Sequence, residues 1–432
     1  MKSKVVSVCW LILIVGVVIF TSLTFGEAPV GAIANTPKNV AAEGNSTEVN
    51  GTTTMVTKTC GEILSEKENI KQSILEVSEL FISSCFSANS NLDDQNFIYP
   101  NSSHFKKYVN NRHYLINLRR EAFSNSKTLE NFTLQINDMD VKDDCAIVLA
   151  RARECYSYLD EPNQTAASIV EYLIVLRNTD SGWKVYWATS NDAYSKMIEE
   201  QTSFGKINGL VLPWCKDNGF YLVLGQTIRH SATAIFQHCD NFTYNNFNNL
   251  IANEEKNIKK ELGELRDNVN YPQGTGDFSR FAMKSYQNNW ALSRNPIWAD
   301  YTGLGGDCQN YASQVIKAGG APFDESGSYK WYWYSDANRS PSWTGVISMQ
   351  NYIRYNSGLG PNGKFVSSAS TLLTGDMVHI DLNSNGTYDH AVVIYNPGSS
   401  PTVSGHTEDC INKRLSEFPG TKQYICLTHY GT

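Results

Sequence analysis

The chain has 432 residues, of which 41% are apolar and 12% aromatic, and this composition is typical of globular proteins with two or three domains. It carries a formal net charge of −7. With no basic stripe along the chain, this charge excludes a nucleic-acid partner.

The N-terminus has the pattern of an export signal. Lys2 and Lys4 precede an apolar run from Val5 to Phe25, and Ala32-Ile33-Ala34 offers a cleavage site. We therefore predict a signal peptide or a membrane anchor over residues 1–34. Either form leaves the rest of the chain secreted or associated with the cell envelope, on the extracellular side. Contact with a membrane is expected only through this segment, if it stays uncleaved.

Composition and periodicity divide the remainder into four parts. Residues 35–59 are rich in Asn, Thr, Ala and Gly and form a low-complexity tether. Residues 60–195 read as helices followed by long strands, which predicts a small α+β accessory domain that loosely resembles a cystatin or NTF2 cone. Residues 196–275 form a helical connector, with a helix near Asn249–Asn268, that can pack on either neighbour. Residues 276–432 form a second α+β domain.

The cysteine count agrees with export. Of ten cysteines, Cys9 lies in the signal and Cys308 in a motif of its own, which leaves eight that permit four disulfides. Neighbours in sequence suggest the pairs Cys60–Cys85, Cys215–Cys239 and Cys410–Cys426. Cys145 and Cys155 share one predicted strand, so their pairing with each other is the weakest.

Cys308 carries the strongest functional pattern. The turn Gly303-Leu304-Gly305-Gly306-Asp307 delivers this cysteine to the start of a helix that Gly319-Gly320 ends. A helix N-terminus lowers a thiol pKa and favours the nucleophilic thiolate. His390 begins the apolar strand His390–Tyr395 and is the expected general base. His379 competes with it, although its strand allows it to face solvent.

A third group should orient the imidazole of His390. If the turn between the last strands centres on Gly398, His390 lies opposite His406, and facing residues of antiparallel strands have Cβ atoms about 4.5–5.5 Å apart. His406 is therefore the candidate, and Asp409 is the alternative. Besides the backbone N–H of Cys308, the side chains of Tyr301 and Gln309 are candidate oxyanion donors.

These residues resemble a known family. Five segments are similar, in this order, to the amidase domain of exported bacterial proteins. They are Asp277-Phe278-Ser279-Arg280, Gly306-Asp307-Cys308-Gln309-Asn310-Tyr311, Gly375-Asp376, Asp389-His390 and His406-Thr407-Glu408-Asp409. That family is related to the NlpC/P60 and CHAP hydrolases. The resemblance implies a papain-like cysteine hydrolase fold over about residues 277–432, with the cysteine helix packed on an antiparallel, barrel-like sheet. Gln309 departs from the Thr or Ser expected there.

Two further patterns each allow two interpretations. Asp381–Asp389 resembles a calcium loop without its final Glu, because Val392 stands at that position. We expect a polar turn and no cofactor, with a structural calcium ion as the alternative. The aromatic residues Trp331, Tyr332, Trp333, Tyr334 and Trp343 either line a substrate groove or fill the small core.

The sequence thus predicts an exported cysteine amidase or peptidase that forms a thioester at Cys308, with Cys308, His390 and His406 as catalytic residues. Export and family kinship indicate cell-wall peptide as the substrate and partner. The alternatives are a non-catalytic wall-binding or adhesion module and an acyl or amide transferase on the same fold.

Overall fold

Strand β3 joins the two halves of this protein. The computed structural model describes residues 60–87, 96–200, 247–266, 278–302, 306–356 and 358–431, within a compact unit that spans Thr59–Thr432. In it, ten strands form one antiparallel sheet in the order β1-β2-β3-β11-β10-β9-β8-β12-β7, with β4 also paired to β3. The prediction of a mixed α+β fold is confirmed. The predicted signal and tether lie outside the described residues.

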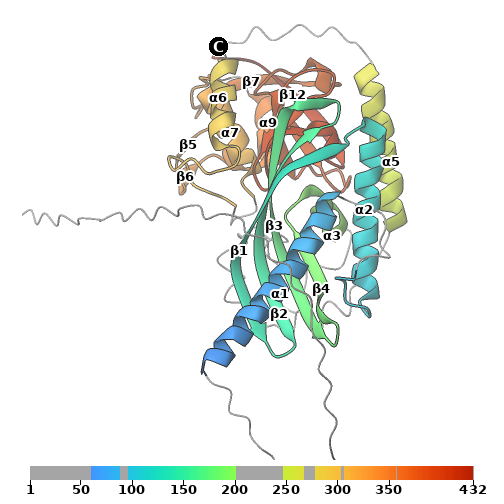
Figure 1. Cartoon of the computed structure of the whole chain (residues 1–432). Helices are drawn as coiled ribbons and strands as arrows, with labels where there is room; N and C mark the ends of the chain where they lie inside the picture. Colours follow the sequence, from blue (N-terminus) through green and yellow to red (C-terminus); the bar gives the residue numbers. More distant parts are fainter. Residues whose placement is uncertain are drawn as a thin grey trace, which may run out of the picture. The chain divides into compact units, whose positions relative to one another are not determined.

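The N-terminal part begins with helices and continues with long strands, as predicted. Its elements are α1 (Cys60–Ser87), α2 (Ser103–Phe123), β1 (Lys127–Lys142), β2 (Cys145–Tyr158), β3 (Glu161–Thr179), β4 (Gly182–Ser190) and α3 (Ala193–Glu200). Helix α1 crosses the sheet formed by β1 to β4 (Figure 1). Ile74, Phe81 and Ile82 pack in its core.

Helix α5 (Phe247–Arg266) confirms the helix predicted near Asn249–Asn268. It lies beside α2 (Figure 1) and packs on both halves of the described chain. Arg119 of α2 forms ion pairs with Glu254 and with Glu261. On the other side, Lys422 Nζ lies 2.7 Å from Glu261 and Gly420 N donates to Glu254 at 2.9 Å.

The C-terminal part places helices before its strands. It comprises α6 (Arg280–Trp290), α7 (Cys308–Ala318), β5 (Trp333–Ser335), β6 (Asn338–Arg339), α8 (Pro341–Thr344), α9 (Val346–Tyr355), β7 (Pro361–Val366), η4 (Ala369–Thr371), β8 (Met377–Asp381), β9 (His390–Asn396), β10 (Thr402–Gly405), β11 (Asp409–Arg414), η5 (Leu415–Glu417) and β12 (Thr421–Tyr430). Helix α7 has the predicted bounds, and it packs on β9. β5 and β6 form a separate pair.

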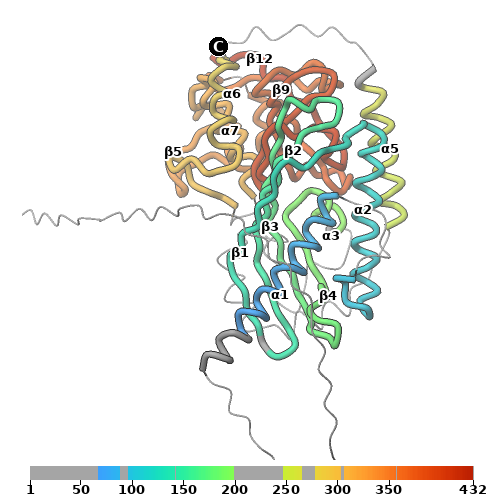
Figure 2. Tube along the Cα trace, viewed as in Figure 1, coloured from blue at the N-terminus to red at the C-terminus, as the bar shows by residue number. Residues whose placement is uncertain are grey.

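Strand β3 belongs to both halves of the sheet because it pairs with strands from both the N-terminal and the C-terminal part of the chain. One edge pairs with β2 along nearly its whole length. On the other edge, Tyr172–Thr179 pairs with β4, and Ala167, Ser168 and Ile169 pair with β11. Figure 2 follows the strand from beside α1 toward the C-terminal strands. Both faces of its middle section are buried, in agreement with its mostly apolar sequence, which Ser168 and Glu171 interrupt.

The predicted disulfides are not formed where the structure tests them. Cys410 is a buried free thiol, because β10, β9 and β8 lie between its strand β11 and the strand β12 of Cys426. Disulfides need Cα atoms within about 7 Å. Cys85 is also free, which removes the Cys60–Cys85 pair. Cys145 and Cys155 both lie on β2, as predicted. Cys215 and Cys239 lie outside the described residues.

Within the described part of the chain, no helix combines the length and the apolar run that crossing a bilayer requires.

The free thiol of Cys410 can be tested by alkylation. Denaturing the protein without a reductant should allow iodoacetamide to label Cys410, because the thiol is protected only by burial. Peptide mass mapping reads out the label. A non-reducing digest that yields a crosslinked Cys410–Cys426 peptide would contradict the sheet order.

The ion pairs of Arg119 should be a major source of stability. Its side chain is 1% exposed, so Arg119→Ala leaves the buried Glu254 carboxylate without a cation and Glu261 with Lys422 alone, and should cost about 3–5 kcal/mol. Urea denaturation measures the loss. The matched control is Lys260→Ala, which removes the exposed Lys260–Glu264 pair of the same helix and should cost at most about 1 kcal/mol.

Candidate active site

Cys308 lies at the first position of α7, at the wall of a cavity. The cavity has a volume of about 300 Å³ and is lined by Tyr301, Gly306, Cys308, Arg339, Thr344, Gly345, Val346, Ile347, Ser348, Tyr388 and Asp389. Cys308 is 6% exposed and packs with Val346 and Ala391. The cysteine is therefore largely buried and lines an open cavity, which is a placement suited to a nucleophile.

Asp307 fixes the start of this helix. One carboxylate oxygen accepts hydrogen bonds from Tyr301 N at 3.0 Å and Asn310 Nδ2 at 2.7 Å. The other accepts from His406 Nδ1 at 2.6 Å. Because Asp307 is 1% exposed, these bonds form in a low-dielectric environment and are strong. They hold the residue next to Cys308 in one position.

His406 supports Asp307 and does not face His390. Its Nε2 donates to the Trp290 carbonyl at 2.8 Å, and its ring stacks on Tyr311 with centroids 4.1 Å apart. Both ring nitrogens are thus used, and neither is left to orient His390.

The predicted register of the last hairpin is wrong by one residue. An irregularity after Thr402 shifts the pairing, so that Val403 faces Ile394 and Ser404 faces Val393. Extending this register aligns His406 with Ala391 and not with His390. Directly opposite residues share a face of the sheet, so the argument that placed His406 beside His390 fails.

Asp409, the alternative candidate for orienting His390, binds a different residue. Its two carboxylate oxygens accept hydrogen bonds from the Arg294 guanidinium at 2.9 Å each.

His390 begins β9 as predicted, but its side chain lies on the face of the strand away from α7. It shares that face with Val392, and its ring stacks on Phe418 with centroids 5.7 Å apart. Ala391 and Val393 occupy the face toward α7. The Nδ1 atom of His390 is buried without a hydrogen-bond partner among the described residues.

His379 lies on the face toward α7. It pairs with Ala391 across the sheet, and its Nε2 is 3.0 Å from the Gln309 side-chain oxygen. His379 is fully buried, so the expectation that it faces solvent is wrong. Gln309 is used in this contact and does not line the cavity, whereas Tyr301 does.

Electrostatics at the site favour a neutral Cys–His pair. Burial raises the pKa of Cys308, against the opposing effects of the Lys196 ammonium and the backbone N–H groups of Ala391 and Gln309. The expected lowering by the helix N-terminus is therefore overcome. Burial, followed by the positive charge of Lys196, holds the pKa of His390 well below its ordinary value.

Lys196 is the residue that sequence reasoning missed. It comes from α3 in the N-terminal half, yet its charge acts on Cys308, Asp389 and His390. Helix α3 is docked here by two bonds: Ala193 N donates to Glu408, and Asn191 Nδ2 donates to the Thr407 carbonyl. No local pattern signals a contact made across more than a hundred residues of chain.

The loop at Asp381–Asp389 is closed by its own backbone. The Asp381 carboxylate accepts hydrogen bonds from Asn385 N at 3.0 Å and Gly386 N at 2.7 Å. Val392 is fully buried in β9 and offers no oxygen. Among the described residues, no group of three or more His, Cys, Asp or Glu side chains could hold a metal ion.

The aromatic residues divide between the two interpretations. Trp331 and Trp343 are fully buried in the core beneath α7, where Trp343 Nε1 donates to Asn310 Oδ1 at 2.7 Å. Tyr334 is exposed. None of the five lines the cavity of Cys308.

Comparison with known proteins finds similarity in the C-terminal part of the chain. Residues 277–428 match a family described as "Putative amidase domain". The C-terminal third of the chain is similar to an amidase. A protein of Bacillus subtilis (strain 168), the uncharacterized protein YhbB, is 29% identical over 135 residues, which are 31% of this chain. The match spans 42% of that relative's length. The family match supports a hydrolase that acts on amides.

Thiol labelling tests the neutral pair. A thiol with a raised pKa should react with iodoacetamide about tenfold faster for each pH unit between roughly pH 6 and 9, because its thiolate fraction grows tenfold. Lys196→Gln should slow labelling at every pH, since the ammonium lowers the pKa of Cys308. Cys308→Ala gives the background of other thiols. A labelling rate that is already constant near pH 7 would contradict the raised pKa.

Proposed function

We propose that residues 276–432 form a papain-like cysteine amidase with Cys308 as the nucleophile. The single observation that carries this proposal is the position of Cys308, at the start of α7 and at the wall of a cavity, within the region that matches the amidase family. The proposed substrate is an amide bond of cell-wall peptide, reached on the extracellular side of an exported protein.

The reaction begins from the neutral pair. His390 takes the thiol proton while Cys308 Sγ bonds to the amide carbonyl carbon, and the backbone N–H groups of Gln309 and Ala391 that act on the sulfur lie beside the developing charge. The C–N bond then breaks, and the imidazolium returns the proton to the leaving amine. Water attacks the thioester, the C–S bond breaks, and the product is a carboxylic acid with the thiol restored.

His390 must turn toward the thiol for this step. Its backbone directly precedes Ala391, which packs against Cys308, and its Nδ1 has no hydrogen bond to break among the described residues. His406 and Asp307 serve as positioning residues in this scheme. His379 is the competing base, favoured by its place on the face toward α7 and limited by its bond to Gln309.

Turnover of purified cell-wall peptide tests the assignment. Cys308→Ala and His390→Ala should each lose about 10³-fold or more in kcat/KM, because nucleophile and base act as one unit. His379→Gln should lose about tenfold at most, since it alters only the support of Gln309. Release of free amino groups and mass analysis of the products measure the rates and identify the bond.

The outcomes separate the alternatives. Turnover by Cys308→Ala at the wild-type rate would reject the cysteine mechanism, and a larger loss in His379→Gln than in His390→Ala would move the base to His379. Wall binding without turnover in any variant indicates a binding module. Products that change when a free amine is added indicate acyl transfer.

A further inference from the structure

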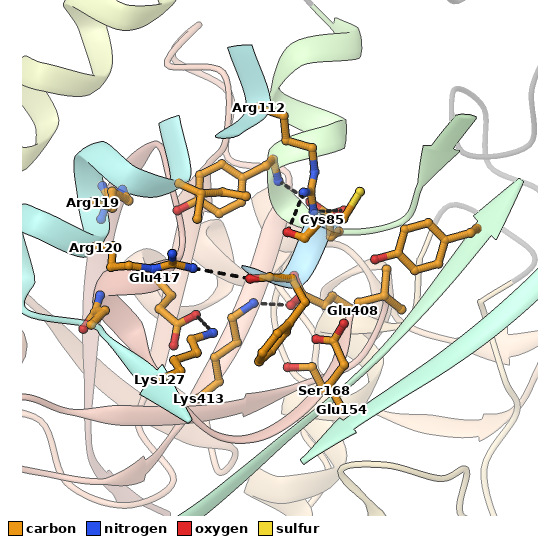
Figure 3. Close-up of a pocket in the computed structure, with 17 residues that line it drawn as sticks. Cys85, Arg112, Arg119, Arg120, Lys127, Glu154, Ser168, Glu408, Lys413 and Glu417 are labelled. Atoms are coloured by element: carbon orange, nitrogen blue, oxygen red, sulfur yellow. Dashed lines mark hydrogen bonds and ion pairs between the residues drawn. The ribbon is translucent and has the colours of Figure 1, made fainter. Parts of the chain in front are cut away.

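A second pocket lies away from Cys308, where the N-terminal half meets the segment from Glu408 to Glu417. Its inner cavity has a volume of about 70 Å³. Figure 3 shows side chains of both halves converging on this space. They are Cys85, Phe86, Arg112, Ile116, Arg119, Arg120, Asn125, Lys127, Glu154, Ser168, Val170, Tyr172, Asp192, Tyr194, Glu408, Lys413 and Glu417.

The inner cavity adjoins a larger one. A neighbouring cavity of about 570 Å³ is lined by Phe86, Arg120 and Lys127, which also line the inner cavity, and by Ser83, Ser84, Ser87, Ser126 and Leu129. The three shared residues therefore stand where the two spaces meet. Beyond them the wall carries four serine residues and Leu129, and its exposed surface is mainly apolar. The volume of this outer cavity leaves room for more than a few water molecules.

Most charges around the inner cavity are paired. Arg112 lies 3.0 Å from the Asp192 carboxylate. Lys127 pairs with Glu417, and Lys413 pairs with Glu408. Arg119 is matched by Glu254 and Glu261, which lie behind the wall. Lys422 also pairs with Glu261, so these groups together carry no net charge.

Arg120 is the exception. Its guanidinium donates to the carbonyls of Ser87 at 2.8 Å and Phe86 at 3.3 Å, and to Asn117 Oδ1 at 3.2 Å. No carboxylate among the described residues pairs with it. A positive charge without a counter-charge thus stands at the junction of the two cavities, and a guanidinium binds carboxylates through two parallel hydrogen bonds.

Glu154 adds a hydrogen-bond donor to the inner wall. It is 6% exposed and has no hydrogen bond or ion pair with the described residues. Lys127, Lys413, Arg112, Glu408, Cys85 and Tyr172 surround it from the other elements. Burial raises the pKa of Glu154 to about 8. At pH 7 its carboxyl group is therefore mostly neutral and carries an O–H.

We propose that these adjoining cavities bind a small molecule with a single carboxylate, which pairs with Arg120 and contacts Glu154. The remainder of the molecule occupies the outer cavity. One unmatched positive charge fits a monoanion better than a phosphate dianion. The proposal does not depend on the chemistry of Cys308.

Calorimetry on the full chain with Cys308→Ala tests the site without turnover. The probes are an N-acetylated dipeptide with a free carboxylate, its C-terminal amide, acetate and inorganic phosphate. The acid should bind at least about tenfold more tightly than the amide, because only the acid pairs with Arg120. Equal affinities, preference for phosphate, or no binding of any probe at about 10 mM would overturn the proposal.

Variants place the ligand in the pocket. Arg120→Gln should weaken binding of the acid about tenfold or more, and Arg120→Lys less, because lysine keeps the charge without the planar fork. The matched control is Arg153→Gln, an exposed residue next to Glu154 that does not line either cavity. Unchanged affinity in a folded Arg120→Gln protein would reject the assignment.

The pH dependence tests Glu154 separately. Affinity for the acid should fall as pH rises through about 8, because the ionised carboxylate then repels the ligand. Glu154→Gln stays neutral and donates an N–H, so it should bind similarly at pH 7 and lose this decline. A decline that persists in Glu154→Gln would show that another group is responsible.

Discussion

Four consecutive residues, His406 to Asp409, hold the described halves of this protein together at the candidate active site. His406 bonds to Asp307 beside the nucleophile. Thr407 and Glu408 accept hydrogen bonds from the start of α3. Asp409 pairs with Ile169 across the sheet and binds Arg294. Because these contacts come from both halves, the geometry around Cys308 depends on the N-terminal half as well as on its own domain.

This dependence gives the N-terminal half a physical role. Through α3 it places the Lys196 ammonium where its charge acts on Cys308 and His390. Through β3 it completes the edge of β11. The same segment also forms one wall of the second pocket, through Glu408 and Lys413. An occupant of that pocket would thus contact residues only a few positions from His406.

Burial sets the chemistry of the candidate pair. A thiolate–imidazolium pair needs solvent or counter-charges, and here the cysteine and histidine lie beneath the surface beside a positively charged lysine. The desolvation of the thiol outweighs the amides and the ammonium that favour the thiolate. Proton transfer in the reaction step then takes the place of a preformed ion pair.

The sequence predicted what is local and missed what depends on pairing between distant strands. The start of α7 at Cys308 and the start of β9 at His390 follow from turn residues and apolar patterns. The strand pairing of the last hairpin differs by one residue from the register expected for a turn centred on Gly398, so His406 does not lie opposite His390. The Cys410–Cys426 prediction failed because neighbours in sequence are separated by three strands in the sheet. No sequence pattern predicts that Lys196 lies near Cys308, since its position follows from tertiary packing alone.

The central claim is that Cys308 forms a covalent bond with its substrate. Acid quenching of the protein during turnover of cell-wall peptide, followed by peptide mass mapping, tests this claim most directly. The account predicts a thioester adduct on the peptide that contains Cys308, sensitive to hydroxylamine and lost in Cys308→Ala. Continued turnover by Cys308→Ala, or an adduct on a different residue, would contradict it.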